Sequence, residues 1–123
     1  MAQKILLIDD DQFIREMYEE VLKNAGYEVE TGVDGKDGLE KIMKGGYDLI
    51  LLDVMLPYID GIGILKTLQE SKTEKTNGPI MLLTNLAFDP VIEEAMQRGA
   101  VACLNKAEIN PGEFLTKVKE ILK

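Results

Sequence analysis

Five short runs typical of strands alternate with stretches of helical periodicity along the whole chain, and all except the weaker second run are apolar. The runs span residues 5–8, 27–31, 49–52, 80–83 and 101–104. Alternating strands and helices predict βαβ units, because parallel neighbours in a sheet are usually joined by a crossover helix. The sequence therefore predicts an α/β fold, with an open, mostly parallel five-stranded sheet, helices on both faces and right-handed crossovers.

The ends of the expected helices carry start and stop signals. Residues that favour helix starts are Asp11, Asp34, Asp89 with Pro90, and Asn110 with Glu113 three positions later. Gly26 and Gly99 each follow an expected helix, as a glycine just beyond a helix end would. The polar stretch 71–78 predicts a loop.

Length and charge narrow the range of functions. The 123 residues fit one domain, so we expect a single domain over residues 1–123. Lys and Arg number 14 and Asp and Glu number 22, so the net charge is 14 − 22 = −8 at pH 7. An acidic surface repels nucleic-acid phosphates and anionic lipids, and we expect neither nucleic acid nor membrane as a direct partner. It favours basic protein partners and divalent cations.

Rare residue types bear on chemistry and location. The chain has no histidine, which excludes a His-based triad, a His metal site and a phosphohistidine on this chain. Cys103 is the only cysteine, so no disulfide can form within the chain and a reducing compartment fits. The first apolar run is too short for a signal peptide or a membrane span. We expect a cytoplasmic protein.

Polar residues stand directly after four of the expected strands. Asp9 and Asp10 follow the first, Asp53 the third, Thr84 the fourth, and Lys106 comes just after the fifth. Ligands of open α/β sheets bind beyond the carboxyl ends of the strands, so we expect these side chains to meet there. Carboxylates gathered in one crevice must protonate, move apart or hold a cation. Hard oxygen ligands without histidine select Mg²⁺ or a similar ion.

Such a set of groups can carry out phosphoryl transfer. The carboxylate attacks, the metal neutralises charge, and a hydroxyl and an ammonium group bind the phosphoryl oxygens. Each residue also has an ordinary structural interpretation: an aspartate can cap a turn, a threonine can end a strand, and a lysine can be solvated. Asp11 is assigned to the cap of the next helix, and Asp53 alone could equally cap the turn into Leu56 and Pro57. Their joint occurrence at matching strand ends favours phosphoryl transfer.

These residues resemble the receiver domains of response regulators, and the resemblance covers essentially the whole chain. It rests on the acids at 9–11, on the segment 53–61 with its Pro57 and Asp60-Gly61, on Thr84, and on Gly99-Ala100 before Lys106. The resemblance implies a chemotaxis-type receiver with a flavodoxin-like (βα)5 three-layer sandwich. The expected strand order 2-1-3-4-5 comes from this resemblance.

The resemblance also implies a metal site. Asp10 would be a direct ligand of Mg²⁺, or of Mn²⁺ in its place, and Asp9 would hold the metal mainly through water. Asp53 and the backbone carbonyl of Met55 would complete the protein's share of the ligands.

Asp53 would be the phosphoacceptor, and Thr84 and Lys106 would bind the phosphoryl group. Family members take this group from a phosphohistidine and lose it to water, so the implied protein is not an enzyme acting on other substrates. With no histidine in the chain, the donor must be a sensor histidine kinase, a phosphotransfer protein or a small phosphodonor. The output partner would be another protein, which the sequence does not identify.

Two positions depart from the family pattern. Cys103 stands where an aromatic residue is common, three positions before Lys106. The aromatic ring that usually links the phosphorylation site to the face of the fourth helix, fifth strand and fifth helix is therefore missing from this position. Cys103 is interpreted as a small core residue. Ala107 replaces a common proline, and because a cis bond costs about 3 kcal/mol without proline we expect a trans bond or a shifted loop.

The lack of a linker after the last helix favours a stand-alone receiver. Other functions stay open beside it. One is a receiver fragment of a longer DNA-binding regulator, and another is a phosphorylation-independent binding module. A haloacid-dehalogenase-type phosphatase would need a second acid two residues after Asp53, where Met55 stands. A flavodoxin-like cofactor binder would need a glycine-rich loop after the first strand, where three aspartates would repel a phosphate.

Overall fold

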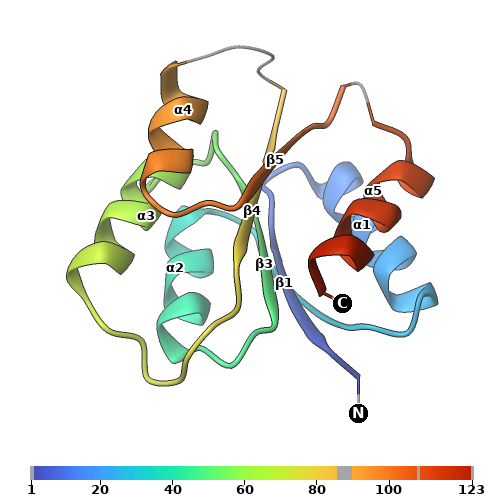
Figure 1. The fold of residues 1–123 in the computed structure, drawn as a ribbon, viewed down its shortest axis with the longest axis horizontal. Helices are drawn as coiled ribbons and strands as arrows, with labels where there is room; N and C mark the ends of the chain where they lie inside the picture. Colours follow the sequence, from blue (N-terminus) through green and yellow to red (C-terminus); the bar gives the residue numbers. More distant parts are fainter. Residues whose placement is uncertain (1, 86–89, 108, 123) are drawn as a thin grey trace.

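The computed structural model describes residues 2–85, 90–107 and 109–122. Strands and helices alternate strictly along this part of the chain (Figure 1). The strands are β1 (Lys4–Ile8), β2 (Glu28–Gly32), β3 (Leu49–Asp53), β4 (Ile80–Thr84) and β5 (Ala102–Asn105). The helices are α1 (Gln12–Asn24), α2 (Gly35–Lys44), α3 (Gly61–Glu70), α4 (Pro90–Gln97) and α5 (Pro111–Leu122). Within the described residues, no helix has the length and apolar content needed to cross a membrane.

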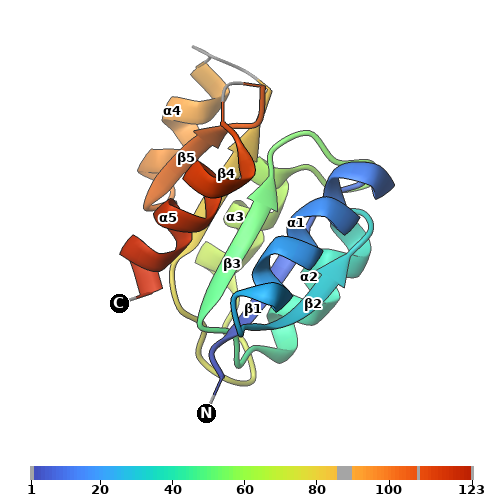
Figure 2. The same ribbon diagram turned by 90° about the vertical axis from the view of Figure 1, so that its right-hand side faces the viewer.

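The strands form one parallel sheet in the order β2-β1-β3-β4-β5. Helices α1 and α5 cover one face, and α2, α3 and α4 cover the other (Figures 1 and 2). The predicted α/β fold, its three layers and its strand order are therefore confirmed. Because all five strands run the same way, their carboxyl ends meet at one edge of the sheet.

Two strands lie one residue later than the apolar runs indicate. Strand β2 extends to Gly32, whose carbonyl accepts from the Asp9 backbone N–H at 3.1 Å. Strand β5 extends through the polar Asn105, which pairs with Thr84. The backbone N–H of Lys106 then donates to the Thr84 carbonyl at 2.7 Å. Backbone pairing, which apolar periodicity does not report, carries both strands to the sheet edge where the polar residues lie.

The core has two layers, one on each side of the sheet. Along β1, Ile5 and Leu7 pack against α1 and α5, whereas Leu6 and Ile8 belong to the layer beneath α2, α3 and α4. All four are completely buried, as expected for a central parallel strand covered on both faces. The residue that directly follows β1 is therefore held by a rigid strand.

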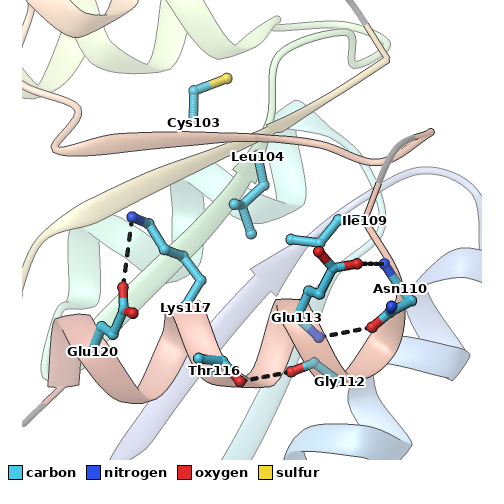
Figure 3. A pocket seen from close by; sticks show the side chains of 9 residues that line it. All are labelled: Cys103, Leu104, Ile109, Asn110, Gly112, Glu113, Thr116, Lys117 and Glu120. Carbon is cyan, nitrogen blue, oxygen red and sulfur yellow. Dashed lines mark hydrogen bonds and ion pairs between the residues drawn. The ribbon is translucent and has the colours of Figure 1, made fainter.

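Most of the expected helix boundaries are confirmed. The cap side chains accept from backbone N–H groups as follows: Asp11 from Ile14 at 3.1 Å, Asp34 from Asp37 at 2.8 Å, Asp60 from Gly63 at 2.8 Å and Asn110 from Glu113 at 2.8 Å. Glu113 accepts in return from the Asn110 N–H at 3.2 Å, which completes a capping box at the start of α5 (Figure 3). Gly26 and Gly99 have φ of 97° and 117° just beyond α1 and α4. Asp89 lies outside the described residues.

The start of α2 and the loop after β3 are packed tightly together. The Gly35 N–H donates to the Pro57 carbonyl at 3.2 Å. A Cβ atom at Gly35 would lie 1.6 Å from the Ile59 carbonyl oxygen, so only glycine fits there. This close approach holds the segment after Asp53 in place.

Candidate functional site

The carboxyl edge of the sheet carries a small polar pocket. Its volume is about 290 Å³, and it is lined by Asp9, Asp10, Asp11, Ile14, Asp53, Met55, Asn85 and Lys106. The β1–α1, β3–α3 and β5–α5 connections supply most of these residues. Of the site residues expected from sequence, Thr84 is the one that does not line the pocket. It is fully buried at the end of β4, directly before Asn85.

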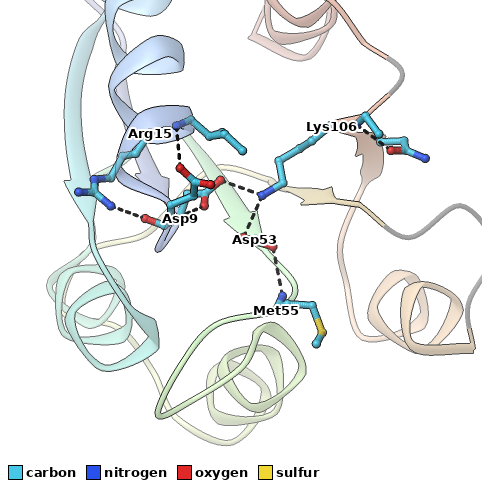
Figure 4. A network of polar contacts seen from close by, with 9 residues as sticks. Asp9, Arg15, Asp53, Met55 and Lys106 are labelled. Atoms are coloured by element: carbon cyan, nitrogen blue, oxygen red, sulfur yellow. Dashed lines mark hydrogen bonds and ion pairs between the residues drawn. The ribbon is translucent and has the colours of Figure 1, made fainter.

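The Lys106 side chain joins two of the acids. Its Nζ lies 3.0 Å from Asp9 Oδ2 and 3.0 Å from Asp53 Oδ2 (Figure 4). The three side chains are only 5%, 0% and 6% exposed, respectively. Burial alone would lower the pKa of Lys106, but its hydrogen bonds to Asp9 and Asp53 outweigh burial, and the net direction is upward. Lys106 therefore remains an ammonium donor at neutral pH.

Asp53 stands at the end of the central strand β3 and uses both carboxylate oxygens. Oδ2 accepts from Lys106, and Oδ1 accepts from the Met55 backbone N–H at 3.1 Å. The latter bond is a turn contact of the kind considered from the sequence, and it leaves Asp53 facing the pocket. Burial, with a smaller contribution from the nearby Asp9, raises the pKa of Asp53 to about 6 against the opposing effect of Lys106.

Asp9 is completely buried and held at four points. Its Oδ1 accepts from the Asp11 N–H at 3.0 Å, and its Oδ2 accepts from Lys106. Its backbone N–H donates to Gly32, and its carbonyl accepts from Arg15 Nη1 at 2.8 Å. Its neighbour Asp10 is exposed and turned toward the pocket. The two adjacent acids thus differ sharply in how firmly they are held.

The donor set fits a divalent cation. Carboxylate oxygens of Asp9, Asp10 and Asp53 lie within 4.8 Å of one another. These three carboxylates and the Lys106 ammonium sum to −3 + 1 = −2 when all are ionised. Carboxylate and carbonyl oxygens, without histidine or thiolate, are the ligands that Mg²⁺ prefers.

Sequence reasoning missed Arg15 as part of this region. A signal was present, because Arg15 lies near the start of α1, where the helix dipole disfavours a cation. A cation in that place calls for a local partner, and the Asp9 carbonyl supplies one. Ile14 and Asn85, which also line the pocket, carry no comparable signal.

The two departures from the family pattern have plain structural outcomes. The Cys103 side chain is half-buried and packs with the layer beneath α2, α3 and α4, as expected of a small core residue. Burial raises the pKa of its thiol, which keeps the thiol protonated. The bond between Lys106 and Ala107 is trans, as predicted, since no described peptide bond is cis.

Comparison with known proteins agrees with the geometry. Residues 5–119 match the response regulator receiver domain family. The chain is 38% identical to the Bacillus subtilis alkaline phosphatase synthesis transcriptional regulatory protein PhoP, over all of this chain and 50% of that protein. It is 36% identical to a Haemophilus influenzae CpxR homolog, over 98% of this chain and 50% of that protein. The chain therefore spans about half the length of these curated relatives.

Solved structures agree as well. The Vibrio cholerae chemotaxis response regulator CheY4 superposes with a TM-score of 0.87 and 34% identity, covering 99% of this chain and 100% of that one. A CheY-like receiver domain protein from Methanospirillum hungatei gives a TM-score of 0.85 and 30% identity over 99% of this chain and 94% of that one. These neighbours match the chain from end to end.

Proposed function

Since this chain belongs to the response regulator receiver domain family of two-component signalling, we propose that Asp53 accepts a phosphoryl group in a Mg²⁺-dependent reaction. The observation that carries the proposal is the position of Asp53. It ends the central strand beside two further acids, and its carboxylate is held 3.0 Å from the Lys106 ammonium. Asp9 shares the burial and the Lys106 contact, but it follows β1, which lies beside the central strand, rather than ending β3 itself.

The chain's own residues supply most of what the transfer needs. A carboxylate oxygen of Asp53 attacks phosphorus, the P–O bond forms, and the bond from phosphorus to the donor breaks. No general base is required, because Asp53 attacks as an anion. Lys106 already faces Asp53, so its ammonium can follow a phosphoryl oxygen without being moved into the pocket. The Thr84 hydroxyl would bind another phosphoryl oxygen from the end of β4.

The metal would be held by Asp9, Asp10, Asp53 and the backbone carbonyl of Met55. When bound, Mg²⁺ supplies positive charge that neutralises the phosphoryl oxygens. The contacts of Asp9 support a ligand that acts mainly through water, because its two oxygens already accept from Asp11 and Lys106. Mn²⁺ has the same ligand preferences and can take the same place.

The donor would be a sensor histidine kinase or a phosphotransfer protein. Three large exposed apolar side chains on the segments that follow β1 and β3 support a protein donor: Phe13, Met55 and Tyr58 are 76%, 64% and 84% exposed, and Met55 lines the pocket. Phe13 lies in the first turn of α1, and the other two lie between β3 and α3. Exposed apolar side chains grouped at one edge are typical of a contact surface. The receiver would then signal by protein contacts, catalysing only its own phosphorylation and dephosphorylation in the cytoplasm.

A second candidate is a receiver fragment of a longer DNA-binding regulator. It is favoured by the match to only half the length of relatives named transcriptional regulatory proteins. In that case the acceptor chemistry at Asp53 is unchanged, and any contact to DNA would belong to another part of the protein. The net charge of −8 supports a receiver that does not itself bind nucleic acid.

Intact-mass measurement after incubation with acetyl phosphate tests the proposal. We expect wild-type protein to gain one phosphoryl group with Mg²⁺ and none in EDTA, and Asp53→Asn to gain none. Asp34→Asn is the matched control, because Asn caps α2 as well as Asp does and the residue lies outside the pocket. A folded wild-type protein that gains no mass would instead indicate a phosphorylation-independent binding module.

A further inference from the structure

We propose that Arg15 is a positioning residue for the metal site, which fixes the peptide group between Asp9 and Asp10 so that the Asp10 carboxylate faces the pocket. The inference rests on the proposed Mg²⁺ site. It assigns a role to a residue that does not line the pocket and that would touch neither metal nor phosphoryl group.

The contact itself is specific. Arg15 Nη1 donates to the Asp9 carbonyl oxygen at 2.8 Å, reaching back from the first turns of α1 (Figure 4). That oxygen belongs to the peptide group whose nitrogen is Asp10's. With the Asp9 N–H bound to Gly32 at 3.1 Å, the backbone is held immediately before the exposed acid.

Asp10 depends on this backbone more than Asp9 does. The Asp9 side chain has its own partners in Asp11 and Lys106. Among the described residues, none donates a hydrogen bond to the Asp10 carboxylate, so the backbone, which fixes the position of its Cβ atom, is what limits where the carboxylate can lie. A ligand held in this way keeps its aim only if the preceding peptide plane does not turn. Arg15 provides that restraint with a charged donor, which is the stronger kind of hydrogen bond.

The location of Arg15 argues against a purely electrostatic role. A cation near the start of α1 opposes the helix dipole, and the charge of a guanidinium group beside the acids would repel an incoming metal. Charge and positioning therefore predict opposite results when Arg15 is removed. Loss of charge alone tightens Mg²⁺ binding, whereas loss of positioning weakens it.

Titration calorimetry of the full chain with MgCl₂ distinguishes a positioning role of Arg15 from a purely electrostatic one. We expect Arg15→Met to weaken Mg²⁺ binding about tenfold, the size usual for residues that orient metal ligands. Arg15→Lys should recover most of the affinity, because an ammonium can still donate to the Asp9 carbonyl. The matched control is Lys23→Met, which removes the same charge from the same helix at an exposed residue that pairs with Glu19 of that helix at 2.7 Å. It should leave the affinity unchanged.

Equal or tighter Mg²⁺ binding by Arg15→Met than by wild type overturns the inference, as does Arg15→Lys binding no better than Arg15→Met. Far-UV circular dichroism in EDTA establishes that each variant is folded. If Arg15→Met does not fold, Arg15→Gln, which retains a neutral donor, is measured against Arg15→Lys with the same expected order. Wild-type protein that binds no Mg²⁺ would contradict the proposed function itself, which is a different result.

Discussion

Lysine–carboxylate pairs lie at both ends of strand β1, but they differ in solvent exposure and in charge balance. At its start, Lys4 Nζ lies 2.7 Å from Glu30 Oε2, and the Tyr47 hydroxyl donates to Glu30 Oε1 at 2.9 Å. The Lys4 and Glu30 side chains are 38% and 42% exposed. Just beyond its other end, the buried Asp9 shares Lys106 with Asp53. The Lys4 cluster has equal positive and negative charge and is open to water. The Lys106 cluster is buried and has two acids for one base.

The pKa directions express the difference. The hydrogen bond from Lys4 lowers the pKa of Glu30, so the charged form of that carboxylate is favoured. Burial raises the pKa of Asp53 even though it also accepts from a lysine. An ion pair alone therefore does not decide which form of a carboxylate is preferred; solvent access and the local charge balance do. The balanced cluster can stabilise the fold, whereas the buried one is suited to receiving another cation.

The largest expected effect is that of removing the buried cation. Lys106→Met leaves Asp9 and Asp53 facing each other, and we expect it to lower the free energy of unfolding by about 3 kcal/mol in EDTA. Urea unfolding at pH 7.5 measures this. Lys66→Met, on the exposed face of α3, is the control and should change stability by less than about 0.5 kcal/mol. A loss as small as the control's would mean that the two clusters do not differ as described.

Asp53→Asn should stabilise the metal-free protein at neutral pH. Because the folded pKa of about 6 lies above the ordinary value of 3.8, the folded state holds the proton more tightly. Wild-type stability should therefore fall as pH rises from about 4 to about 6, and Asp53→Asn should lack this fall. At pH 7.5 we expect the variant to be more stable by about 2 kcal/mol.

Urea unfolding of both proteins in EDTA at pH 4, 5, 6 and 7.5 tests the sign of the stability difference between Asp53→Asn and wild type. The gain should vanish at pH 4, where the wild-type Asp53 is neutral, and shrink when Mg²⁺ is added. A variant less stable than wild type at pH 7.5 would show that Lys106 outweighs burial at this position.

The smallest effect is expected at the start of β1. Lys4→Met should lower the free energy of unfolding by less than about 1 kcal/mol, as is usual for exposed pairs. The loss should shrink further in 0.5 M NaCl, since salt screens exposed charges. Thermal unfolding at low and high salt, beside the Lys106→Met protein, provides the measurement. A loss at Lys4 that matches the one at Lys106 would remove the contrast between the two ends.

Much of this molecule could be predicted from its sequence, because the strongest signals coincide. Buried parallel strands such as β3 appear in the sequence as continuous apolar runs, and helix caps such as Asp11 and Asp34 are residue types that favour helix starts. The meeting of Asp53 and Lys106 follows from parallel topology once the strands are placed. What could not be predicted depends on which atoms meet across space. The contact of Arg15 with a backbone carbonyl and the Lys4–Glu30 pair leave no periodic trace.

The same limit applies to the strand ends. Strand β5 runs one residue further than its apolar run because Asn105 pairs with Thr84. Polar residues at the end of a ladder look like loop in the sequence, although they are the residues that bring the site together. Cys103 is the opposite case. Its residue type alone predicts a small core residue, and the structure places its half-buried side chain in the core layer beneath α2, α3 and α4.

Lys106 lies 97 positions after Asp9 in the sequence, and this separation has a consequence during synthesis. The chain leaves the ribosome with its acids first, and Lys106 joins them only after β5 has emerged and docked against β4. A partly made chain therefore has the three acids without the buried ammonium that balances them. Competence to receive a signal would then begin only with the completed fold, so that unfinished chains cannot compete with finished ones for the phosphodonor.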